Sequence, residues 1–475
     1  MKAIKDYINS YKFYITTAIA VLLMITTLIS VGFGALNKNL SIAGDVEYVQ
    51  DVGNMIMRWT TSSSGDFHSS ADTDKIRTVD FLDNKNIPNN AVDTWYVSVN
   101  PNTRKVMAWV IDDPDNAGYY KLYIGADGDV VGNINSSYIF YGMSELEIIS
   151  FNNNFDTSKI TDMSSMFKIY TGISYAGYGL SYDYQNKLTA INGLECFDTK
   201  NVKNMSYMFS VLDKITNLNL SAFDTSSVTT MKGMFSHCES LTNLNLNNFN
   251  TSNVSNMVGM FSSCFQLTNL NISTFNTIKV TDFNSMFYQC IFLSNLDVTH
   301  FNTQNTTDMS AMFYDCKHIV TLDLNNFDTS KVLYMEFMFS GCDNLTNLNI
   351  TSFNTSKVID MACMFQSCKL LSSINVNNFD TSNVTDMSSM FAFCRNITNL
   401  DLTNFNSSQV TDMSSMFSGC SYLVQIKISS LWDVSNVTTS TYMFLNSTLL
   451  PNYNSSYTDV SMAKPTTQGG YMTLV

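Results

Sequence analysis

A Met-Phe pair that recurs at a constant interval of 26 residues is the feature that most constrains this chain. The pair ends at Phe209 and then at every twenty-sixth residue as far as Phe417. Upstream, Phe167 precedes Phe209 by 42 residues, which indicates a 16-residue insertion, and Phe444 follows Phe417 by 27. Self-similarity at a fixed period of about 20–50 residues is typical of solenoids, in which each repeat contacts only its neighbours. We therefore predict that each repeat is one coil.

The apolar residues around each Met-Phe pair are spaced like one face of a helix. Intervals of three, three, one and three residues place them on one stripe at 100° per residue. We expect a short amphipathic helix in each coil. In the coil centred on Phe261 the stripe consists of Val254, Met257, Met260, Phe261 and Cys264.

A two-residue alternation follows the stripe. Leu270 and Ile272 alternate with Asn269 and Asn271, which predicts a short strand with its aliphatic side chains inward and its amides outward. The fold class is therefore α/β: a leucine-rich-repeat-type solenoid with one short strand and one short helix per 26-residue coil.

The N-terminal segment predicts export of the rest of the chain. Residues 13–36 are uncharged and long enough to span a bilayer as a helix of about 20 residues. Lysines at 2, 5 and 12 place the short N-terminus in the cytoplasm by the positive-inside rule. The alternative to a transmembrane anchor is a cleaved signal peptide, because Gly32 and Gly34 offer small residues at a cleavage site. We expect either a membrane-anchored protein with its C-terminal region extracellular or a secreted one.

The remaining boundaries follow from changes in composition. A Ser, Gly and Asp cluster predicts a linker, and alternating Val, Tyr and Trp runs between Asn and Pro turns predict a small β-rich cap before the repeats. The predicted divisions are a cytoplasmic N-terminus at 1–12, the anchor or signal at 13–36, a linker at 37–70, the β-rich capping unit at 71–150, the repeat solenoid at 151–445 with an insertion at 168–186, and a C-terminal tail at 446–475.

The acidic charge balance of the chain argues against a nucleic-acid partner. The chain carries 26 Lys and Arg against 40 Asp and Glu, for a net charge of -14, and it has no basic block. Acidic turns at 112–116 and 127–129 could suggest calcium, but the twelve-position loop with its closing Glu is missing. Asp, Asn, Gly and Pro are the residues that tight turns require.

The repeat text resembles the BspA-like leucine-rich-repeat surface proteins of bacteria, a family with a 26-residue repeat. The matching words are FDTSNVTDMSSMF at 379–391 with Cys394 after it, strand residues such as Leu241, Leu244 and Leu246, and the lead-in VMAWVIDDPDNAGYYKLYIG. The resemblance covers about 71–445. It implies a cell-surface protein in adhesion or host interaction, whereas the lipid or wall-sorting motif of many relatives is not found.

The cysteines raise the question of metal or redox chemistry. One position, three residues after the Phe, holds eight of the ten, and it lies on the apolar stripe, where a buried thiol packs as a small hydrophobe. Disulfides between adjacent coils are the alternative. We expect no metal, because no His shares the column. The column is Cys238, Cys264, Cys290, Cys316, Cys342, Cys368, Cys394 and Cys420.

No catalytic constellation is visible, and we expect neither an enzyme nor a cofactor. The four histidines occupy unrelated repeat positions, and no phosphate loop, GxSxG elbow or HExxH word occurs. A column of aspartates that includes Asp282, Asp308 and Asp386 is interpreted as caps at the helix starts.

Binding is the better hypothesis, with a host or neighbouring-cell protein or glycan as the partner. The outward amides Asn243, Asn245, Asn269 and Asn271 could bind it, although amide columns also solvate a sheet by bonding to one another. The insertion is the second candidate, because exposed tyrosines are favoured contact residues, although solenoids also simply tolerate insertions. A structural or spacer protein of the cell envelope without a specific ligand is the alternative function. The insertion tyrosines are Tyr170, Tyr175, Tyr178, Tyr182 and Tyr184.

Overall fold

The structure is a computed structural model and describes residues 55–56, 73–99, 105–169 and 186–475, together with the backbone of 173–176 and 179–182. The segment predicted to be an anchor or signal, 13–36, lies outside the described residues, as does the N-terminus at 1–12. Within the described ranges, no helix combines the length and apolarity needed to cross a bilayer.

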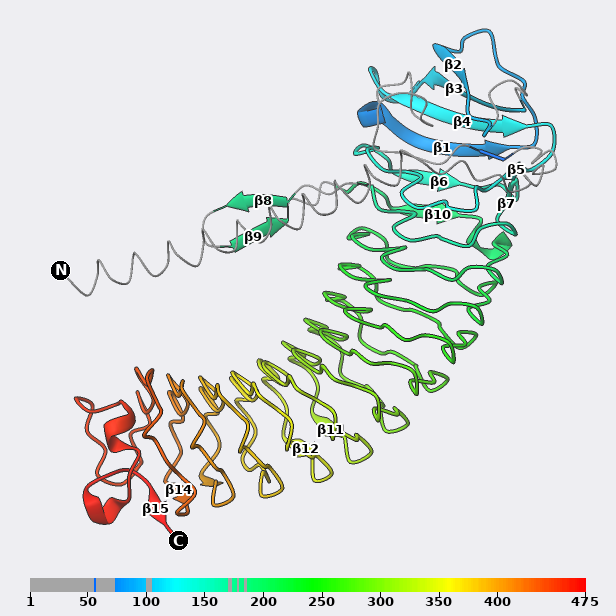
Figure 1. The fold of residues 1–475 in the computed structure, drawn as a ribbon. Coiled ribbons are helices and arrows are strands. Elements are labelled where there is room, and N and C mark those ends of the chain that lie inside the picture. The colour runs from blue at the N-terminus through cyan, green and yellow to red at the C-terminus, as the bar shows by residue number, and fades with distance from the viewer. Residues whose placement is uncertain (1–54, 57–72, 100–104, 170–172, 177–178, 183–185) are drawn as a thin grey trace, which may run out of the picture. The chain divides into compact units, whose positions relative to one another are not determined.

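Stacked coils confirm the predicted solenoid (Figure 1). The phenylalanines of the Met-Phe pairs form a continuous column, with neighbouring ring centroids 5.2 Å apart between Phe167 and Phe209 and 6.0 Å apart between Phe391 and Phe417. The column begins at Phe140, whose ring stacks on Phe167 at 5.7 Å. Ile139 replaces the methionine there, so this first coil lacks the Met-Phe pair. The coils therefore start before residue 151.

The predicted helix in each coil is wrong: the described residues contain no α-helix, and the segment is a run of overlapping β-turns. Gly233 N–H donates to Val258 O of the next coil at 2.8 Å, whereas Met234 N–H donates to Met231 O of its own coil at 3.1 Å. Positive φ angles of 58° at Gly233 and 59° at His237 interrupt any helix. Consecutive turns produce the same inward spacing as a helix while releasing alternate N–H groups for the next coil.

The two-residue alternation is confirmed, but only some neighbouring coils pair their strands by a hydrogen-bonded ladder. Leu244 and Leu246 are buried while Asn243 and Asn245 are exposed. In the coil array, parallel pairs join β11 to β12, β13 to β14 and β6 to β10, and a single bridge joins Asn269 to Asn295. These strands are β6 (Ile148–Ser150), β10 (Ala190–Asn192), β11 (Thr321–Asp323), β12 (Asn347–Asn349), β13 (Asn399–Asp401) and β14 (Gln425–Ile428).

A β-rich unit continues the sheet of the first coils. Its order is β10-β6-β1-β4-β3-β2, so β1 pairs in parallel with coil strand β6 and covers that edge (Figure 1). Within the predicted linker, Met55 and Ile56 are buried, and they bridge to Val131 and Ser98. The elements are η1 (Thr73–Lys75), β1 (Ile76–Leu82), β2 (Asp93–Tyr96), β3 (Val106–Asp112), β4 (Tyr120–Ala126), and the pair β5 (Val130–Val131) and β7 (Phe155–Asp156).

Residues 446–475 close the other end of the array. The ring of Tyr471 is buried against Phe444, with centroids 5.2 Å apart, and its hydroxyl donates to Tyr457 O at 2.8 Å. The last strand, β15, pairs in parallel with β14, where a further coil would pair. The elements of the two ends and of the insertion are η3 (Leu194–Cys196), η4 (Val460–Met462), η5 (Thr466–Gln468), β15 (Thr473–Leu474), β8 (Ile173–Ala176) and β9 (Gly179–Tyr182).

A buried hydroxyl joins each coil to the next. Thr251 Oγ1 donates to Asn276 O at 3.0 Å and accepts from Asn276 N–H at 2.7 Å. The Asn276 side chain in turn accepts from Ile278 N–H at 3.1 Å, which fixes the turn. The Phe-Asx-Thr word of the repeat therefore encodes a cross-link between coils. The same donor position is held by Thr157, Thr199, Thr225, Thr277, Thr303, Thr329, Thr355, Thr381 and Ser407.

Candidate binding surface

The four predicted amides divide into two kinds. Asn245 Oδ1 accepts from Asn247 N–H, and Asn271 Oδ1 accepts from Ser273 N–H, both at 3.1 Å, so these two hold the turn after the strand. Asn243 and Asn269 lie on the strand segment with exposed amides. Asn243 and Asn269 are therefore the two amides that face solvent without fixing a turn. The Asn269 Nδ2 group donates to the hydroxyl of its neighbour Thr268.

Two columns of uncharged, mostly polar side chains run along the strand segments of nine successive coils. Backbone bonds keep the coils in register, such as Ser294 N–H to Thr268 O at 3.2 Å. The residues are exposed, Gln425 partly, and none of them is charged. We name these the strand-face columns; the first is Thr216, Thr242, Thr268, Ser294, Val320, Thr346, Ser372, Thr398 and Val424, and the second is Asn217, Asn243, Asn269, Asn295, Thr321, Asn347, Ser373, Asn399 and Gln425.

Exposed aromatic side chains stand two residues before the first strand-face column in some coils. Phe292 is 40% exposed and Tyr422 is 58% exposed. The ring of Phe292 lies 5.0 Å from that of His318 in the next coil. Neither aromatic residue was predicted as a site residue, although both occupy one repeat position, five residues after the Met-Phe pair. Aromatic faces beside hydroxyls and amides suit a ligand with an apolar face and polar edges.

The tyrosines of the insertion are only partly described. Tyr170, Tyr178 and Tyr184 lie outside the described residues. Tyr175 and Tyr182 lie on β8 and β9, which pair antiparallel with Tyr175 opposite Leu180. The insertion therefore contains a β-hairpin, where an irregular loop was expected.

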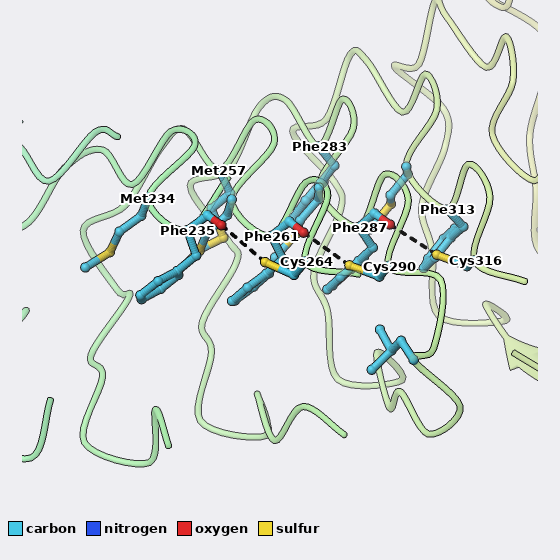
Figure 2. Close-up of a cluster of buried hydrophobic side chains, with 14 of the residues drawn as sticks. Met234, Phe235, Met257, Phe261, Cys264, Phe283, Phe287, Cys290, Phe313 and Cys316 are labelled. Carbon is cyan, nitrogen blue, oxygen red and sulfur yellow. Dashed lines mark hydrogen bonds between the residues drawn. The ribbon is translucent and has the colours of Figure 1, made fainter. Parts of the chain in front are cut away.

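The cysteine column consists of buried free thiols, in agreement with the packing interpretation. Cys264 Sγ donates to Phe235 O at 3.2 Å, and the same bond recurs from Cys290 to Phe261 O at 3.1 Å (Figure 2). Burial raises the pKa of Cys264 to about 12, so its thiol stays protonated at neutral pH. Ser447 replaces cysteine in the last coil and donates to Phe417 O. The column is a row of hydrogen-bonded packing residues.

The aspartate column also has a local structural role. Asp308 Oδ1 accepts from Ser310 N–H at 2.8 Å, and Asp386 Oδ1 accepts from Ser388 N–H at 2.7 Å. These carboxylates cap turns, because the helices that they were predicted to cap are absent. Burial raises the pKa of Asp282, to which the charge of Asp308 adds. In the described part of the chain, no group of three or more His, Cys, Asp or Glu side chains could hold a metal ion.

Comparison with solved structures finds two bacterial repeat proteins. A leucine-rich repeat protein from Bacteroides ovatus is 15% identical, with a TM-score of 0.35. The match covers 72% of this chain and 84% of the Bacteroides chain. The functional domain of InlJ from Listeria monocytogenes, whose description includes a cysteine ladder, is 15% identical over 65% of this chain and 62% of its own, with a TM-score of 0.17. Comparison with curated proteins finds no match.

A family model covers most of the chain. The model described as "Mycoplasma protein of unknown function, DUF285" matches residues 134–174, 179–294, 292–378 and 371–468. Its match begins in the coil of Phe140, where the column of stacked rings also begins. The chain therefore belongs to the DUF285 family of Mycoplasma repeat proteins.

Proposed function

We propose that this protein is a cell-surface adhesin that binds neutral glycans, or proteins that carry them, through the strand-face columns. The observation that carries the proposal is the pair of exposed, uncharged columns along nine coils. Elsewhere along the coils, by contrast, polar side chains such as Thr251 and Asp308 are used to hold turns or neighbouring coils.

The spacing of the columns supports a repeating ligand. Parallel strands lie about 4.8 Å apart, so donors and acceptors recur at that interval along the array. Amides and hydroxyls can donate and accept, which suits sugar hydroxyls, and the adjacent Phe292 and Tyr422 rings offer apolar faces. The columns themselves carry no charge, so they offer no electrostatic attraction to an ionic partner.

The proposed location is the bacterial cell surface. It is supported by the uncharged segment 13–36 and by the resemblance of the repeat text to BspA-like surface proteins. In this proposal the segment anchors the protein with the solenoid outside, or is cleaved to secrete it. Neither route involves an enzyme activity or a cofactor.

A spacer role in the cell envelope is the second candidate, and one observation favours it. Some outward side chains bond to each other between coils: Asn271 Nδ2 donates to Asn247 Oδ1, and Thr351 Oγ1 donates to Asn325 Oδ1, both at 2.9 Å. A surface that satisfies its own polar groups needs no ligand. These bonds lie in the turn after the strand, beside the strand-face columns.

A binding test separates the two functions. The full chain is applied to an array of neutral glycans and glycoproteins, and the double variant Asn243→Ala/Asn269→Ala is compared with it. We expect about a tenfold loss of affinity, since each lost hydrogen bond contributes about 0.5–1.5 kcal/mol. Gln304→Ala/Gln409→Ala is the matched control, because it removes two exposed amides outside the columns.

The insertion is tested on the same array with Tyr175→Ser/Tyr182→Ser. If this variant alone loses binding, the site is the hairpin and the strand-face proposal fails. An intact chain that binds nothing on the array supports the spacer role.

A further inference from the structure

Three neighbouring coils each contribute one unusual residue to a small basic cluster. Lys168, Tyr207 and Lys232 occupy turn positions that hold small or neutral residues in most other coils. The Lys168 ammonium lies 5.9 Å from the Tyr207 ring centroid, and the Lys232 ammonium lies 6.0 Å from the same centroid. Tyr207 N–H donates to Lys232 O at 2.7 Å, which fixes two of the three coils relative to each other.

A glycine holds the tyrosine ring in place. Gly233 follows Lys232, and a Cβ at Gly233 would stand 2.3 Å from Tyr207 Cε1. The ring therefore lies directly on the backbone of the next coil. In the following coil, a Cβ at Gly259 would stand 3.6 Å from its nearest neighbour, so that position has room for a side chain. The close approach at Gly233 is therefore not repeated at the equivalent position of the following coil.

The described residues place no counter-charge at bonding distance from either ammonium group, and the Lys232 charge acts on the Asp282 carboxylate only at longer range. Among the described residues, no carboxylate oxygen lies within 4.0 Å of either one. Two other lysines of the coil of Phe209 are paired: Lys200 with Asp198 at 2.7 Å and Lys214 with Asp213 at 2.8 Å. Both Lys168 and Lys232 are half-buried, so their charges are less screened than those of exposed lysines.

Stabilisation of the fold does not account for this arrangement. A cation–π contact at a partly exposed site contributes only about 0.5–1 kcal/mol, and burial of an ammonium group without a carboxylate partner disfavours its charged form. A bound anionic group would supply the counter-charge that the described residues do not place beside either lysine. We propose that Lys168, Tyr207 and Lys232 form a binding site for the sulfate or phosphate esters of an anionic glycan.

The site differs from the strand-face columns in place and in chemistry. It lies on the turn segments of the coils of Phe167, Phe209 and Phe235, and its ligand is charged. The proposal does not rest on the proposed function, and each can fail separately.

Heparin serves as the sulfated probe, and inorganic phosphate as the small-anion probe. We expect heparin to bind the full chain and the double variant Lys168→Met/Lys232→Met to bind it about tenfold more weakly. Methionine keeps the apolar stem and removes only the charge. Lys279→Met/Lys331→Met is the matched control, because these lysines bond only to Asn253 and Asn305 and removing them changes net charge equally.

Each outcome decides the proposal. Equal heparin binding by the parent and the Lys168/Lys232 variant overturns it, as does an equal loss in the control variant or no heparin binding at all. If phosphate binds at this site and heparin does not, the ligand is a small anion and the glycan assignment is overturned. The thermal midpoint of each variant shows whether a loss of binding reflects unfolding.

A spectroscopic measurement adds a readout that folding alone does not move. Burial lowers the pKa of Lys168 in the free protein. NMR titration of the lysine ammonium groups is expected to show that pKa rising when heparin is added, because a bound anion stabilises the charged form. An unchanged Lys168 pKa in the presence of bound heparin would place the ligand elsewhere.

Discussion

At the scale of single residues, the repeat is held by hydrogen bonds that its apolar pattern does not reveal. Thr251 is fully buried, and its hydroxyl both donates to and accepts from the backbone of Asn276. A buried backbone N–H or C=O that loses its partner costs about 1–3 kcal/mol. The threonine is therefore as structural as the neighbouring phenylalanine.

Thr251→Val is expected to lower the free energy of unfolding by about 2–4 kcal/mol, because valine has the same shape and leaves two backbone groups of Asn276 without this partner. Thr251→Ser is the control, since Ser407 makes the equivalent bond in a later coil. Urea unfolding measures both. A valine variant as stable as the serine variant would show that the hydroxyl bond contributes little.

Because its thiols are buried, the protein is expected to lose stability at alkaline pH. Burial raises the pKa of Cys264 and Cys420 to about 12, whereas an unfolded thiol ionises near its ordinary value of about 8.5. The folded state then binds more protons than the unfolded state, so stability is complete below that value and falls as pH rises toward 12. Each such thiol contributes about 1.4 kcal/mol per pH unit within this window.

We therefore expect the urea midpoint to fall steeply above about pH 9. The double variant Cys264→Ser/Cys290→Ser should show a shallower slope, because serine does not ionise there and Ser447 already occupies the equivalent position. An identical slope in both proteins would exclude the thiols as its cause.

At the scale of elements, one ion-pair network joins the β-rich unit to the first coils. Arg77 on β1 donates from Nη1 to Asp113 Oδ2 at 2.8 Å and also bonds to Glu147, which precedes coil strand β6. Burial alone would raise the pKa of Asp113, but the Asp115 N–H together with the Arg77 and Lys121 charges lowers it below its ordinary value. Asp113 is almost fully buried, so this pair is not an ordinary surface contact.

Arg77→Met is expected to destabilise the N-terminal coils by about 3 kcal/mol, because it leaves the Asp113 carboxylate buried without its main partner. Since the pKa of Asp113 is lowered by folding, its contribution is complete above pH 4 and is lost as pH falls through the folded value. Hydrogen exchange of β1 and β6 at pH 7 and at pH 3 measures both effects. Lys85→Met, which removes a pair with the exposed Asp127, is the control and should change little.

At the scale of the whole molecule, stability depends on the two closed ends. Each coil bonds to its neighbours, so an array of this kind unfolds from any end that lacks a cover. β1 covers the first coil strands, and Tyr471 with β15 covers the last coil. Loss of a cover should therefore act locally.

Tyr471→Ala removes a fully buried ring and the hydroxyl bonded to Tyr457 O, and a cost of about 3–5 kcal/mol is typical of such truncations. We expect faster hydrogen exchange in the coils after Phe391 and unchanged exchange near Phe209. Tyr457→Ala, which truncates an exposed side chain, is the control. Uniformly faster exchange along the array would show that the solenoid unfolds as one unit.

The division of side chains between core and surface could be predicted from the repeat pattern alone. The constant spacing of Met, Phe and Cys, and the alternation of Leu with Asn, place the side chains inward or outward whatever the backbone does between them. The same pattern also favoured packing thiols over disulfides in the cysteine column, because the column lies on the apolar stripe, and the structure decided between the two.

The path of the backbone could not be predicted in this way, because the hydrogen bonds that fix it join residues 25 positions apart. A helix and a series of turns bury the same stripe, and the turns prevail since the N–H of Gly233 bonds to Val258 in the next coil. The pairing of Thr251 with Asn276, and the meeting of Lys168, Tyr207 and Lys232 from three coils, depend on the same stacking. Such contacts leave no local signal, because each residue meets its partner only when the coils stack.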